Sequence, residues 1–445
     1  MVAVLLPLYF NPYAHLPIEA VKVLLFQGIT LGMLIVAILS YIQALISGDY
    51  PQTNKGNIRI IFTKSIGDNP LLLPSLVFTF VYLIATYFSI DPVASFWGLS
   101  TKQGTLTVLS IIVFFTLLVT GIRSKEQADR LITSLILGSI PVAIYGWVQF
   151  LGFDPLDWVT GSISIVHSTL GYSLTLGAYL AMIIPITLSR MIGQWGDKGN
   201  RIWAYALIII LQVSCLFFTL ARGAWLGLLV GCLLFLLLLA YRWQRRALIR
   251  LSTVVLIAGG LIFLLLNTGW RTPSLNILNW PSDISIVQAR AISNNERLAV
   301  WRYTLPMIME RPLIGYGPET FSAAFWSYYP YESFQELEYL NPWDAHNIIL
   351  NYLTAIGILG FFVFLWILVR FYRLTLLSLQ LSDDRRKQII VAAVISSVTA
   401  FLVQAQFNPI AFVPLVLFWF LLALGIVVAR DHQEEDSASI SIGAE

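Results

Sequence analysis

The chain has 445 residues, of which 58% are hydrophobic and only 11% charged, and its formal net charge is +3. Soluble globular proteins carry roughly a quarter of their residues as charged side chains, so this composition excludes an ordinary water-soluble enzyme. The basic residues are spread between apolar runs and form no dense block. This distribution argues against nucleic acid as a partner.

Apolar runs long enough to cross a membrane recur along most of the chain. A helix of about twenty apolar residues spans a hydrocarbon core roughly 30 Å thick. The sequence therefore predicts an all-α polytopic membrane protein with about twelve transmembrane helices. The candidate spans are residues 2–14 (a short one), 20–46, 71–90, 103–121, 131–151, 168–189, 202–220, 223–241, 248–266, 346–370, 389–407 and 410–429.

One connection between these spans is far longer than the others. Most connections need only a few residues, and a much longer one usually has a function of its own. The predicted organisation is nine transmembrane helices in 1–266, a large external loop in 267–345, three transmembrane helices in 346–430 and a polar tail in 431–445.

The loop itself divides into two parts. Residues 268–296 are polar and interrupted by prolines, which indicates irregular structure. Residues 297–312 follow, with Leu298, Trp301 and Leu305 at helical spacing. This second part predicts an amphipathic helix on the membrane surface.

Lysine and arginine gather in alternate connections, and short cytoplasmic loops of membrane proteins accumulate these residues. The basic connections are 47–70, 122–130, 190–201, 242–250 and 370–387. By this rule they face the cytoplasm, the loop 267–345 faces the outside, and the tail 431–445 lies in the cytoplasm.

Three ionisable side chains at the predicted outer face are candidates for chemistry. Arg222 lies between two apolar runs, where it could extend to lipid headgroups or clamp a diphosphate with its forked guanidinium. Arg297, at the start of the loop helix, could be a second cation facing the same compartment, or it could belong to a solvated face of the loop. His346 ends the loop, either as a polar membrane anchor or as a base that exchanges protons near neutral pH. Asp344 could stabilise its charged form, and Asn347 could orient its ring.

Metal and cofactor chemistry find no support in the sequence. The four histidines are scattered without ligand spacing, and there is no phosphate-binding loop or dinucleotide fingerprint. We therefore expect neither a metal nor a cofactor.

Three ordered stretches together resemble a known family. They are TLARGAWLGL around Arg222, ERLAVWRYTLPMIMERPLIGYGPETF at 296–321, and HNIILNYLTAIGILG at 346–360. With the long outer loop, this trio resembles the O-antigen ligase and O-antigen polymerase superfamily of bacterial membrane glycan transferases. SIDPVASFWGLSTKQG, residues 89–104, is similar to an external turn of that family.

The resemblance implies an activity and a location. Family members transfer a glycan from an undecaprenyl-diphosphate carrier to an acceptor hydroxyl or amide at the periplasmic face of the inner membrane, without metal or nucleotide. Their acceptors are lipids, glycans or proteins, and their fold resembles that of other metal-independent, lipid-linked glycosyltransferases. Whether this chain would ligate or polymerise is left open.

The resemblance also implies roles for the candidate residues. The family's diphosphate-binding arginines fall on Arg222 and Arg297, and its proposed catalytic histidine falls on His346. The sequence departs from the family pattern at Asp344, where many members have a second histidine, and at Ala355, where they have an acidic residue. Two other functions stay open: a transporter of a small anion such as bicarbonate, and a membrane scaffold whose loop binds a partner.

Overall fold

The computed structural model describes residues 1–11, 18–47, 69–99, 102–156, 166–194, 200–243, 284–329 and 343–430. Within these ranges the chain forms helices and turns and no strand, so the predicted all-α architecture is confirmed. The candidate span 248–266 and the tail 431–445 lie outside the described residues.

Most of the predicted spans are helices in the structure, and the chain is a multi-pass membrane protein. Two apolar helices are shorter, α4 (Leu72–Tyr87) and α6 (Thr105–Gly121). Eight helices are long and apolar enough to cross a membrane: α2 (Ile18–Ser47), α7 (Lys125–Phe150), α8 (Ser173–Gly193), α9 (Arg201–Phe218), α10 (Arg222–Trp243), α14 (Ile348–Leu381), α15 (Arg385–Gln404) and α16 (Phe412–Arg430).

The first candidate span, 2–14, differs from the rest. Its helical part is α1 (Val2–Leu8), with seven residues. At about 1.5 Å per residue such a helix extends about 10 Å, a third of a hydrocarbon core. It packs beside α7, where the carbonyl oxygen of Ala3 lies against Gly138.

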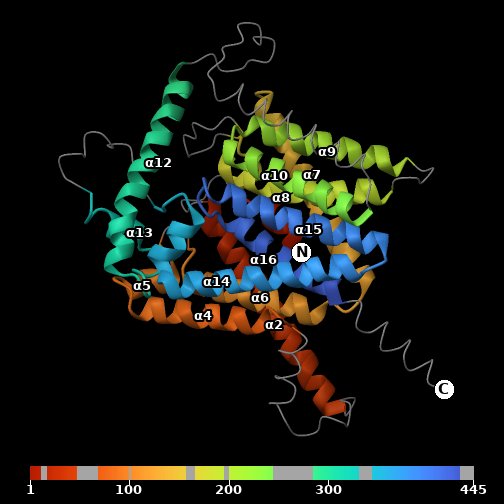
Figure 1. Cartoon of the computed structure of the whole chain (residues 1–445), viewed down its shortest axis with the longest axis horizontal. Helices are drawn as coiled ribbons and strands as arrows, with labels where there is room; N and C mark the ends of the chain where they lie inside the picture. Colours follow the sequence, from red (N-terminus) through yellow and green to blue (C-terminus); the bar gives the residue numbers. More distant parts are fainter. Residues whose placement is uncertain are drawn as a thin grey trace.

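Helices α8, α15 and α16 form the most buried part of the bundle (Figure 1). Helix α10 approaches α15 closely because Gly227 and Gly231 face it. A Cβ at either glycine would collide with the backbone oxygen of Ala400 or Ser396. Small residues at this spacing let membrane helices pack backbone against backbone. At the periphery, Trp203, Leu207 and Ile210 of α9 are exposed, as expected for a face in contact with lipid.

Helix α12 (Ile284–Glu310) lies across one end of the bundle, close to α13 (Phe321–Phe325) and α5 (Pro92–Trp97) (Figure 1). The predicted loop helix is therefore present but longer than expected. It begins at Ile284, so the irregular structure predicted for 268–296 is wrong from that residue on. No proline separates Pro281 from Pro306, so nothing in between prevents the chain from continuing as a helix.

Helix α14 is broken at Gly357, which adopts a left-handed conformation with φ 67°. The segment after α12 fills the break. Ile358 N–H donates to the Pro312 oxygen at 2.8 Å, and Tyr316 N–H donates to the Thr354 oxygen at 2.7 Å. A side chain at Gly357 would collide with this segment. The break therefore ties the loop to the outer part of α14.

Candidate active site

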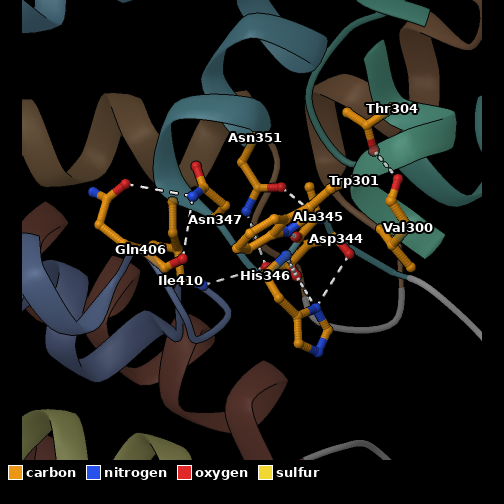
Figure 2. Close-up of polar contacts among 10 residues, drawn as sticks. All are labelled: Val300, Trp301, Thr304, Asp344, Ala345, His346, Asn347, Asn351, Gln406 and Ile410. Carbon is orange, nitrogen blue, oxygen red and sulfur yellow. Dashed lines mark hydrogen bonds and ion pairs between the residues drawn. The ribbon is translucent and has the colours of Figure 1, made fainter. Parts of the chain in front are cut away.

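His346 lies at the junction between the long segment 267–345 and α14, in a strained backbone conformation with φ 52°. Its backbone N–H donates to Asp344 Oδ1 at 2.7 Å, and its ring Nδ1 lies 2.7 Å from the same oxygen. Figure 2 shows the other side of the ring pointing away from the residues drawn. Left-handed backbone outside glycine is maintained only where the surroundings enforce it, and here the two bonds to Asp344 do so.

Asp344 is held from two further directions. Asn351, on the first turn of α14, donates from Nδ2 to Asp344 Oδ2 at 3.0 Å. The backbone N–H of Ile410, just before α16, approaches the same oxygen at 3.3 Å (Figure 2). The carboxylate is thus fixed by α14 and by the turn before α16, and it cannot turn away from the histidine without breaking these bonds.

The geometry determines which nitrogen of His346 is the basic one. Nδ1 faces two acceptors, the Asp344 carboxylate at 2.7 Å and the Asp344 backbone oxygen at 3.2 Å. In the neutral ring Nδ1 must therefore carry the hydrogen, which leaves the lone pair on Nε2.

The same contacts set the charge of the ring. Burial alone would lower the pKa of His346, but the hydrogen bond to Asp344 and the carboxylate's negative charge outweigh it, so that the pKa is raised above its ordinary value of 6.5. Burial acts against the charged form of Asp344 too. The bonds from His346 nevertheless leave the pKa of Asp344 below its usual value. The pair resembles the histidine and carboxylate of hydrolytic triads.

Helix α12 carries Arg297 to the same place. Trp301, one turn further along α12, donates its indole N–H to the Ala345 oxygen at 2.8 Å and so joins the helix to the residue before His346 (Figure 2). The positive charge of Arg297 is near enough to lower the pKa of His346, against the larger effect of Asp344.

Arg222 begins α10 at the same end of the bundle and is half-buried. The turn between α15 and α16 connects it with the histidine. Gly223 packs against the side chain of Asn408 in this turn. From the other side, Ile348 N–H donates to the Ala405 oxygen at 2.8 Å. The three residues singled out from the sequence therefore lie at the same end of the bundle.

A cavity of about 130 Å³ opens beside the histidine–carboxylate pair. Glu319 adopts φ 61° at its wall, another strained non-glycine residue. Behind the wall, buried Glu19 accepts a hydrogen bond from Gln103 Nε2 at 2.8 Å. The lining includes Gln103, Tyr316, Glu319, Trp343, Asp344 and Asn351.

The sequence did not identify all of these groups. Asn347 does not orient the histidine as predicted: its Oδ1 caps α14 by accepting from Ile349 and Leu350 N–H, and its Nδ2 donates to the Gln406 oxygen. The role of Asn351 went unpredicted, although polar residues at 344, 347 and 351, at the start of an apolar helix, are a usable signal.

Glu319 and Gln103 had no local signal, since their neighbours in space are distant in sequence. No group of three histidine, cysteine or acidic side chains in the described ranges is placed to hold a metal ion.

Comparison with known proteins gives two matches. The sequence model of a family described as O-antigen ligase matches residues 206–365, the part of the chain that contains Arg222, Arg297 and His346. A protein of Rickettsia conorii that carries the provisional name of a polysaccharide ligase is 23% identical over 286 residues. The alignment covers 62% of each chain, so it spans about three fifths of that relative. The resemblance indicated by the sequence motifs is thereby confirmed: residues 206–365 match the O-antigen ligase family, within a multi-pass membrane protein.

Proposed function

We propose that this protein is a glycan transferase that moves a glycan from an undecaprenyl-diphosphate carrier to an acceptor hydroxyl or amide, as a ligase or a polymerase. The reaction would take place at the periplasmic face of the bacterial inner membrane. One observation carries the proposal: His346 is paired with Asp344 at 2.7 Å, and Asp344 lines a cavity at the end of the bundle where Arg222 and Arg297 also lie.

His346 is the proposed general base. An acceptor hydroxyl is a weak nucleophile, and a base within hydrogen-bond reach helps by taking its proton as the new bond forms. Nε2 of His346 would accept that proton, while Asp344 stabilises the resulting imidazolium through Nδ1. The acceptor oxygen forms a bond to the anomeric carbon of the glycan, and the bond from that carbon to the diphosphate oxygen breaks.

Arg222 and Arg297 are the proposed partners of the leaving group. The departing diphosphate gains negative charge in the transition state, and fixed cations lower the energy of that state when they face the developing charge. A guanidinium binds two phosphate oxygens at once. The two arginines come from different helices, α10 and α12, and can approach the diphosphate from two sides.

The cavity is the proposed site for the acceptor sugar. Glu319, Gln103 and Asn351 offer polar groups for hydroxyls, and Trp343 and Tyr316 add aromatic surface. Asp344 lines the cavity and His346 does not, so a bound acceptor would extend past the Asp344 side chain to present its hydroxyl to Nε2. The carrier's polyprenyl chain is insoluble in water, so the donor would reach the site laterally from the lipid.

The test is deletion of the protein in its host, followed by analysis of surface glycans and lipid-linked intermediates. A polymerase predicts loss of the ladder of glycan lengths, and a ligase predicts accumulation of long carrier-bound glycan. Expression of wild-type protein should reverse the defect, and the His346→Ala variant should not. An unchanged glycan profile, together with uptake of a small anion by proteoliposomes that lack lipid-linked sugar, would favour the transporter alternative.

A further inference from the structure

A second cavity lies at the opposite end of the bundle from His346. It has a volume of about 520 Å³ and lies where the end of α8 meets the beginnings of α9 and α15. Its walls carry four arginines from these three helices, Arg190, Arg201, Arg385 and Arg386, together with isoleucines 192, 389 and 390. No part of the proposed transfer reaction uses this site.

The charges around the cavity do not cancel. Asp129 bridges two of the arginines: Arg190 Nη1 lies 2.8 Å from its Oδ1, and Arg386 Nη2 lies 2.7 Å from its Oδ2. Asp384 also lines the cavity, but its side chain accepts the Arg386 backbone N–H at 2.8 Å as the cap of α15. Among the residues that the structure describes, four arginines therefore face two carboxylates, which leaves a net positive charge for a ligand.

Arg190 forms the base of the site. It is 8% exposed, and its Nε is a buried donor without a hydrogen-bond acceptor among the described residues, although both terminal nitrogens bind Asp129. Buried donors in proteins are almost always satisfied. An anion in the cavity is a suitable acceptor for such a donor, since guanidinium groups bind phosphate oxygens strongly.

Two helix ends add to the positive potential. The cavity touches Arg201, the first residue of α9, and Arg385, the first residue of α15. The N-terminus of a helix carries a partial positive charge and unpaired N–H groups. In α9 the cap residue Asn200 makes no capping bond with its side chain.

The cavity also borders the lipid-facing surface. Arg201 is followed by Trp203, which is 74% exposed, and further along α9 by exposed Leu207 and Ile210. Tryptophan is typical of the boundary between lipid tails and headgroups. The isoleucines in the wall suit the glycerol and upper acyl part of an amphiphile, and basic pockets between transmembrane helices are known to bind acidic headgroups.

From these observations we infer that the cavity between α8, α9 and α15 binds a phosphate-bearing anion, with Arg190 at its base and Arg201 and Arg385 at its rim. The phosphate belongs either to the headgroup of an acidic phospholipid or to a soluble anion. The membrane position favours the lipid.

Native mass spectrometry of the purified full-length protein tests this site. The apparent Kd is measured for phosphatidylglycerol and for phosphatidylcholine, with and without millimolar inorganic phosphate as competitor. The test variant is Arg201→Gln with Arg385→Gln, two exposed positions whose change leaves the Asp129 ion pairs in place. The matched control is Arg373→Gln in α14, an exposed arginine outside the cavity.

We expect phosphatidylglycerol to bind more tightly than phosphatidylcholine, and the double variant to weaken it by about fivefold per arginine removed. The Arg373 control should bind as the wild type does. If inorganic phosphate fails to displace the lipid, the ligand is the lipid headgroup. If it displaces the lipid at low millimolar concentration, the ligand is the soluble anion. Equal binding of both lipids, or equal weakening in the control, would overturn the proposal.

Discussion

The two ends of the helix bundle are built differently. At the end that carries His346, the backbone is strained. All the non-glycine residues of the described chain with positive φ lie there: Lys102, Ser168, Leu220, Glu319 and His346. At the opposite end the described turns are regular. Ser124 forms a capping box at the start of α7, and Asp384 caps α15.

The polar groups differ in the same way. At the opposite end, Asp129 binds Arg190 and Arg386, and Asp383 binds Arg242, so the carboxylates hold helices together. At the His346 end, the carboxylate of Asp344 holds a titratable ring beside a cavity. Strained backbone persists where the surrounding structure enforces it, and it clusters at functional sites. One end thus fixes the bundle, and the other holds the proposed active site.

The largest expected effect is that of His346→Ala. If the ring is the general base, glycan transfer should fall by about 10²- to 10⁴-fold, while the amount of protein in the membrane stays the same. Transfer is measured with lipid-linked donor in proteoliposomes, and protein amount by immunoblotting of the membrane fraction. Transfer at the wild-type rate would remove His346 from the chemistry.

Asp344→Asn should have a smaller effect, roughly 10²-fold, which is below the about 10⁴-fold loss known for the equivalent change in a serine protease triad. The loss is smaller because the Asp344 backbone oxygen, 3.2 Å from Nδ1, still holds the ring. Asp383→Asn is the control, since it removes a carboxylate from the opposite end and should leave transfer unchanged. Equal losses in the two variants would mean that the ends do not differ in function.

Arg222→Lys and Arg297→Lys should each reduce transfer by about tenfold to a hundredfold. Lysine keeps the charge but loses the forked, two-point contact with the diphosphate. The control is Arg302→Lys, an exposed residue on the same helix as Arg297. The assay is the initial rate at saturating acceptor with varied donor. If the Arg302 variant loses as much activity as the other two, the proposal that Arg222 and Arg297 bind the diphosphate specifically is wrong.

The break in α14 should control stability at the His346 end. Gly357→Ala puts a side chain at φ 67°, where it also meets the backbone of the segment after α12. We expect a loss of about 1–3 kcal/mol and a lower Tm in detergent. Gly28→Ala is the control, because nothing lies within 4 Å of a Cβ at that helical position. A Tm unchanged by Gly357→Ala would mean that the break does not depend on glycine.

Much of the bundle follows from local patterns. Hydropathy predicted the long helices, because an apolar run of sufficient length has few stable structures in lipid other than a helix. The charge pattern placed Arg222 and His346 at one face, and the structure starts α10 and α14 at the same end of the bundle.

The rest depends on contacts between distant segments. The break at Gly357 exists because residues 312–317 pair with α14, and nothing near Gly357 in sequence announces that pairing. The same holds for Glu319 and Gln103, which meet at a cavity although more than two hundred residues separate them. Asp344 was predicted in part. Its position two residues before His346 suggested that it could stabilise the charged ring, but only the structure shows that Asn351 and Ile410 hold its carboxylate.

The pH dependence of transfer tests whether His346, paired with Asp344, is the base. The base must be neutral to accept a proton, and the ion pair raises the pKa of His346 above 6.5. The wild-type rate should rise with pH through a midpoint above 6.5, and Asp344→Asn should move this midpoint to lower pH because the carboxylate charge is lost. A midpoint that stays in place when Asp344 is changed would mean that His346 is not the base.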